Sequence, residues 1–87
     1  MESAELRRAV VDALKAAAPG ALDDAAREAF LAGKSNLLLA QLNLDSLARM
    51  EFCIAIELAT GVTLLPAQLA ALDSTDAVQH YVMERLA

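Results

Sequence analysis

Residues 46–60 carry the pattern that most restricts the fold, because apolar side chains recur there at the spacing of an α-helix. They form two stripes along such a helix: Leu47, Met50, Ile54 and Leu58 in one, and Phe52, Cys53 and Ile56 in the other. A single stripe is enough to hold a helix against a core. The surplus stripe therefore predicts a face for a partner or a bound chain, although Ile54 or Leu58 taken alone could equally belong to the core.

The segments before this helix give one clear helix and one ambiguous region. Residues 3–17 have helical periodicity, with Ser3 as the expected N-cap and a stop at Pro19-Gly20. Residues 21–33 could form a short helix that is capped by Asp23 or Asp24. Residues 37–42 are strongly apolar, but a strand there would have no partner, so an ordered loop or a single helical turn is favoured.

The C-terminal third predicts two further helices. Pro66 suits the first position of a short helix through Leu72. The last helix starts near Ser74, which we expect to act as a cap with Asp76 in the first turn. Residues 1–87 are thus expected to form one all-α domain, a four-helix bundle with a short third helix and a long loop between the first two.

Composition and charge narrow the class of function. Aromatic residues make up only 3% of the chain, so the core must be largely aliphatic. The net charge of −5 disfavours nucleic acid and membrane surfaces as partners and favours proteins with basic patches. A single cysteine, an acidic N-terminus and no long apolar span predict a cytoplasmic protein, which we expect to be a monomer.

Catalytic and metal-binding patterns are missing from the sequence. Cys53 is expected to be a small buried hydrophobe and His80 a surface residue. No His, Cys and carboxylate cluster has metal-ligand spacing, and no nucleophile and base can be paired. We therefore expect a protein that is not an enzyme and holds no metal.

The seven residues Gln41-Leu42-Asn43-Leu44-Asp45-Ser46-Leu47 lead into the central helix. They resemble the acyl carrier protein family, whose usual pattern here is Asp-Leu-Gly-Leu-Asp-Ser-Leu. Asn43 replaces the glycine, and asparagine is the side chain that best tolerates positive φ. The similarity continues through Gly61-Val62-Thr63-Leu64 and the segment from Asp73 to Val82, so it covers roughly residues 37–82.

This resemblance implies a function for Ser46. In that family the serine carries covalent 4′-phosphopantetheine, whose thiol holds acyl groups as thioesters for enzymes of fatty-acid, polyketide or related biosynthesis. A phosphopantetheinyl transferase would attach the arm, with Asp45 assisting its recognition, and acyl-loading enzymes or a ketosynthase would be further partners. The expected docking residues lie on the central helix: Leu47, Met50, Glu51, Ile54 and Glu57.

The central helix departs from many members of the family because it is less acidic. Arg49, Glu51 and Glu57 are its only charged residues, and Leu58 stands where an acid is often found. Partner recognition is therefore expected to depend more on apolar contact than on charge.

The sequence also allows two alternative functions. An aminoacyl or peptidyl carrier would use the same arm. In a different class of protein, an unmodified helical interaction domain, Ser46 would simply help to cap the helix. The second Asp-Ser pair, Asp73-Ser74, lacks the flanking motif and is assigned to capping alone.

Overall fold

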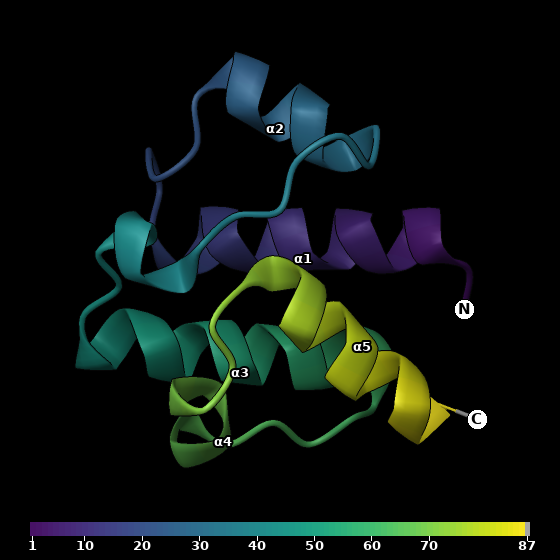
Figure 1. The fold of residues 1–87 in the computed structure, drawn as a ribbon. Coiled ribbons are helices and arrows are strands. Elements are labelled where there is room, and N and C mark those ends of the chain that lie inside the picture. Colours follow the sequence, from purple (N-terminus) through teal and green to yellow (C-terminus); the bar gives the residue numbers. More distant parts are fainter. Residues whose placement is uncertain (87) are drawn as a thin grey trace.

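The computed structural model of the chain describes residues 1–86, and its regular elements are all helical (Figure 1). The α-helices are α1 (Ser3–Ala17), α2 (Asp24–Leu31), α3 (Ser46–Thr60), α4 (Pro66–Ala70) and α5 (Thr75–Leu86), and a 3-10 turn, η1, spans Leu39–Leu42. The predicted all-α class is confirmed. Within residues 1–86 none of the helices has the length and apolar character that crossing a bilayer requires.

The centre of the fold is the pair α1 and α3, which run in opposite directions and make the most extensive contact between any two elements (Figure 1). Helices α2 and α5 pack on α1, and α4 packs on α3. Every α-helix contributes fully buried apolar side chains to one core: Leu6, Val10, Leu14, Phe30, Phe52, Ile56, Leu69, Val78 and Val82. Burial of each such side chain larger than alanine stabilises the fold by about 1.5–3 kcal/mol.

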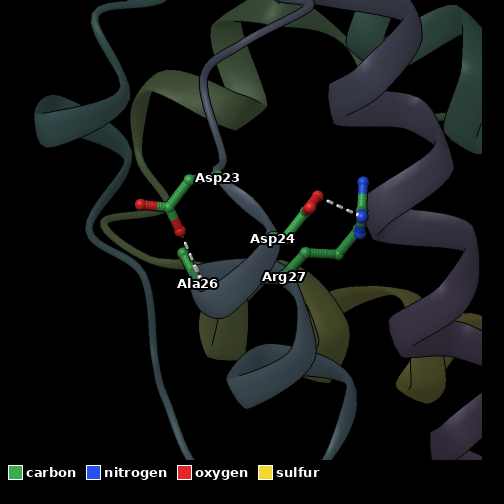
Figure 2. Close-up of polar contacts among 4 residues, drawn as sticks. All are labelled: Asp23, Asp24, Ala26 and Arg27. Atoms are coloured by element: carbon green, nitrogen blue, oxygen red, sulfur yellow. Dashed lines mark hydrogen bonds and ion pairs between the residues drawn. The ribbon is translucent and has the colours of Figure 1, made fainter.

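The structure has five α-helices where four were predicted, because the short helix that the sequence left open within residues 21–33 forms as α2, inside the expected long loop. Figure 2 shows why the chain forms a helix there: the Asp23 carboxylate accepts a hydrogen bond from the Ala26 N–H at 2.7 Å. Asp24 and Arg27, one turn apart, form an ion pair on its exposed side. Asp23 is therefore the N-cap, one of the two candidates that the sequence left open.

The predicted N-cap of α1 is wrong, whereas its predicted C-terminal end is confirmed. The expected N-cap Ser3 is instead the first helical residue, and Glu2 occupies the cap position. The Glu2 N–H donates to the Glu5 carboxylate at 3.4 Å, so the first turn is closed by the glutamate side chain rather than by the serine. The helix ends at Ala17, before Pro19-Gly20, as predicted.

The segment before α3 packs against the start of α5. The Thr75 hydroxyl accepts from the Leu37 N–H at 3.0 Å and donates to the Asn36 side-chain oxygen at 3.3 Å. The same Asn36 oxygen accepts from the Asp76 N–H at 2.9 Å. Leu38 and Ser74 form an isolated antiparallel bridge. We call residues 36–39 with 73–76 the clasp. The turn η1 is one of the two alternatives expected for residues 37–42, an ordered loop or a single helical turn. The expectation that these residues have no β partner is wrong at Leu38, because Ser74 pairs with it.

The remaining boundaries are close to those expected. Helix α3 ends where Gly61 adopts φ 77°, the left-handed conformation predicted for it. Helix α4 begins at Pro66 as predicted but stops at Ala70, two residues earlier than the predicted Leu72.

Candidate functional site

The turn into α3 is built around a left-handed residue. Asn43 has φ 52° and ψ 44°, and it is the only residue other than glycine with positive φ in residues 1–86. The next residue, Leu44, is only 6% exposed and anchors the turn in the core. The expectation that asparagine can replace glycine at this position is thus met by the backbone geometry.

Asp45 and Ser46 have different roles at the start of α3: the aspartate caps the helix, and the serine exposes its hydroxyl. Asp45 is the N-cap of α3, and its carboxylate accepts from the Ala48 N–H at 2.7 Å. Ser46 is the first helical residue, it is exposed, and its hydroxyl makes no hydrogen bond with residues 1–86. Because the aspartate provides the side-chain cap, the serine hydroxyl is not needed for capping.

Ser74, in the other Asp-Ser pair, has the opposite environment. Its side chain is buried, with 8% exposure, and its hydroxyl accepts from the Ala77 N–H at 3.3 Å. Ser74 is therefore the capping residue of α5, as predicted. Only Ser46 of the two presents an accessible nucleophilic oxygen.

The outward face of α3 carries a row of exposed apolar side chains that starts one residue after Ser46. We call this row the outer stripe, and its members with their exposures are Leu47 (59%), Met50 (46%), Ile54 (54%) and Leu58 (83%). At 3.6 residues per turn these four share one arc of the helix, with Glu51 at one border and Glu57 at the other. The five predicted docking residues are thus exposed on one face, while their role in docking stays a prediction.

The second apolar stripe of α3 faces inward. Phe52 and Ile56 have no exposed surface, and Cys53 is 3% exposed. The expectation that Cys53 packs as a small hydrophobe is confirmed. Burial raises the pKa of the Cys53 thiol, and the Arg49 guanidinium one turn earlier offsets part of that rise. A thiol in this environment is a poor nucleophile.

A hollow of about 310 Å³ adjoins the outer stripe. Met50, Cys53 and Ile54 of α3 form one wall, and residues 64–66 form the other. Leu65, which belongs to this wall, is 53% exposed and extends the apolar surface beyond α3. Sequence reasoning missed Leu65, since only the fold brings the link between α3 and α4 beside the outer stripe.

A larger hollow, of about 580 Å³, lies between α1 and α3. Alanines form much of its surface, including Ala9 and Ala13 of α1 with Ala55 and Ala59 of α3. Its charged residues are Glu5, Arg8 and Asp12. It contains neither Ser46 nor any residue of the outer stripe, so it is separate from the candidate site.

Outside this site, the described part of the chain contains no cluster of residues suited to metal binding. No group of three or more His, Cys, Asp or Glu residues among 1–86 could hold a metal ion. His80 is exposed, as predicted, and its Nε2 lies 2.8 Å from a Glu84 carboxylate oxygen. Among residues 1–86 no basic side chain forms a hydrogen bond with the Ser46 hydroxyl.

Comparisons of the chain with protein-family models, with curated proteins and with solved structures gave no match. The residues and the geometry of this chain are therefore the basis for proposing its function.

Proposed function

We propose that this chain is a carrier domain of the acyl-carrier type, in which Ser46 bears a covalent 4′-phosphopantetheine arm. The observation that carries the proposal is the free, exposed Ser46 hydroxyl at the N-terminus of α3, next to an aspartate that performs the capping. The flanking motif of residues 41–47 supports it. The left-handed Asn43 also supports it, because it stands at the position where the family has glycine.

The residues around Ser46 suit the attachment of a phosphate. A phosphodiester on Oγ would lie at a helix N-terminus, where backbone N–H groups and the helix dipole favour negative charge. In the attachment step Ser46 Oγ bonds to the phosphorus that bears pantetheine. One P–O bond of the coenzyme A diphosphate breaks, and 3′-phosphoadenosine 5′-phosphate leaves. The hydroxyl proton passes to a base of the transferase, since no base of residues 1–86 forms a hydrogen bond with the hydroxyl.

The arm would contribute a terminal thiol that holds the cargo as a thioester. This chain contributes the anchor and a surface that partner enzymes contact. The outer stripe, with Glu51 and Glu57 at its borders, provides that surface, and its exposed apolar area supports recognition mainly through apolar contact. The chain itself carries out no reaction in this proposal.

The test is intact-mass analysis after incubation with coenzyme A and a promiscuous phosphopantetheinyl transferase. We expect the wild-type chain to gain one phosphopantetheinyl group and Ser46→Ala to gain none. Ser74→Ala is the matched control, because it removes the serine of the other Asp-Ser pair and should leave the gain intact. An unchanged mass in the wild-type chain, or an undiminished gain in Ser46→Ala, would refute the proposal.

The outer stripe also favours a second candidate, an unmodified helical interaction domain in which exposed apolar side chains bind a partner directly. The same measurement separates the two, since that domain would not accept the arm. An aminoacyl or peptidyl carrier would accept it, and would be distinguished by the cargo that cognate loading enzymes attach.

A further inference from the structure

Arg49 is held toward the N-terminal end of α3, the end that carries Ser46. Its Nε donates to the Leu44 backbone oxygen at 3.1 Å, two residues before the serine. Leu44 is fixed in the core, so this hydrogen bond draws the guanidinium back along the helix instead of leaving it extended in water. The side chain is half-buried.

Within residues 1–86 the guanidinium has no acidic partner, although the chain is rich in acids. Three ion pairs occur within residues 1–86, and Arg49 belongs to none of them. Of the acids nearest in sequence, Glu51 forms no ion pair within residues 1–86, and Asp45 uses a carboxylate oxygen to cap the Ala48 N–H. An arginine has five N–H donors, and the bond to Leu44 occupies only the one on Nε. Both terminal nitrogens are therefore left without a protein partner among the described residues.

Ser46 and Arg49 are neighbours on the helix surface. Residues three apart on an α-helix have Cβ atoms about 5–6 Å from each other. A guanidinium binds phosphate oxygens through paired N–H groups, and the geometry is better defined than for a lysine. The positive end of the helix dipole acts in the same direction.

On the basis of the carrier function proposed above, we propose that Arg49 binds the phosphodiester that would join the arm to Ser46. The guanidinium then fixes the first bonds of the arm against α3, so that the arm leaves the helix in a defined direction. Arg49 is a positioning residue in this account, because it contacts the phosphate and not the reacting thioester.

A purely structural role for Arg49 is the competing explanation, since the hydrogen bond to Leu44 alone could justify the side chain. The two roles differ in what attachment of the arm changes. If Arg49 only satisfies the Leu44 carbonyl, the loaded and unloaded forms lose the same stability when it is replaced. If it binds the phosphate, the loaded form loses more.

The experiment measures the thermal midpoints of the unloaded and loaded forms of the wild-type chain, Arg49→Gln, Arg49→Lys and Arg8→Gln. Arg8 is the matched control because it lies on α1, outside the candidate site, and its replacement changes the net charge equally. We expect loading to raise the wild-type midpoint by an amount on the order of 2 °C. This rise should fall in Arg49→Gln to the part that the helix dipole supplies, be intermediate in Arg49→Lys and remain complete in Arg8→Gln. It should also shrink at about 1 M salt, because the pair is partly exposed to solvent.

The Arg49 Nε–H resonance provides a second readout. It should shift on loading of the wild-type chain, because a phosphate would then contact the same guanidinium. An equal rise of the midpoint in the wild-type chain and Arg49→Gln, together with an unmoved resonance, would refute the role of Arg49 and leave the carrier function intact. A wild-type chain that gains no phosphopantetheine would refute both.

Discussion

The two Asp-Ser pairs of this chain both open helices, but they use their side chains in opposite ways. At α3 the cap is Asp45, whose backbone oxygen accepts from the Arg49 N–H at 2.9 Å and whose carboxylate accepts from Ala48. At α5 the cap is Ser74, whose backbone oxygen accepts from the Val78 N–H at 3.1 Å and whose hydroxyl accepts from Ala77. The helix start is thus shifted by one residue between two otherwise identical dipeptides.

This shift decides which serine is available. When the aspartate caps, the serine becomes the first helical residue and its hydroxyl is not needed by the backbone. When the serine is the cap, its hydroxyl accepts a hydrogen bond from a backbone N–H of the helix. The residue that follows each serine reinforces the difference: Leu47 is 59% exposed, whereas Thr75 is completely buried in the clasp. An Asp-Ser dipeptide is therefore informative about function only together with the position at which its helix begins.

The largest predicted difference in stability is between substitutions of the two residues that follow the serines, Thr75 and Leu47. Thr75→Val keeps the shape of the side chain but removes the acceptor of the Leu37 N–H and the donor to Asn36. We expect a loss of about 1–3 kcal/mol in the free energy of unfolding, because a part-buried N–H and a side-chain oxygen lose their partner. Leu47→Ala should change it by less than about 0.5 kcal/mol. Urea denaturation measures both, and comparable losses would show that the two helix starts do not differ as described.

An intermediate effect is predicted at the caps themselves. Asp45→Ala should cost about 1 kcal/mol through loss of the Ala48 hydrogen bond, while Ser46→Ala should be nearly neutral. At α5 the order should reverse, with Ser74→Ala costing about 1 kcal/mol and Asp73→Ala being nearly neutral. Chemical denaturation of these four variants gives the comparison directly. Equal costs for both serines would contradict the assignment of a free hydroxyl to Ser46.

The smallest effect is predicted at Asn43. Glycine adopts positive φ without a steric penalty, so Asn43→Gly should alter the free energy of unfolding by less than about 1 kcal/mol and leave attachment to Ser46 unchanged. Asn43→Val is the contrasting variant, because a β-branched residue is strained in this conformation. A valine variant as stable as the wild-type chain would show that the left-handed turn is not required before α3.

Features that depend on neighbouring residues could be predicted from the sequence. The turn at Asn43, the start of α3, the left-handed Gly61 and the capping role of Ser74 all follow from local backbone chemistry. The error at Ser3 is also local, because a glutamate three residues beyond the cap position closed the first turn instead.

Features that depend on tertiary contacts could not be predicted. Periodicity divided the apolar residues of α3 into two stripes, but it could not decide whether Ile54 and Leu58 lie in the core, since both stripes are apolar. The position of Leu65 beside the outer stripe and the hydrogen bonds of Asn36 depend on which segments pack together. The hydrogen bond from Arg49 to Leu44 could not be predicted from the sequence pattern either, since it requires the arginine side chain to turn back along its own helix.

The clasp has a consequence for how the molecule opens. In the first turn of α5 the Asp76 N–H donates a hydrogen bond to the side-chain oxygen of Asn36, which is 40 residues away along the chain. The amide hydrogens of Leu37 and Asp76 are both held by side chains of the clasp, so they should exchange with solvent at linked rates whenever it opens. Hydrogen exchange at these two amides would therefore report, from a distance, when the segment leading to Ser46 has come away from the last helix.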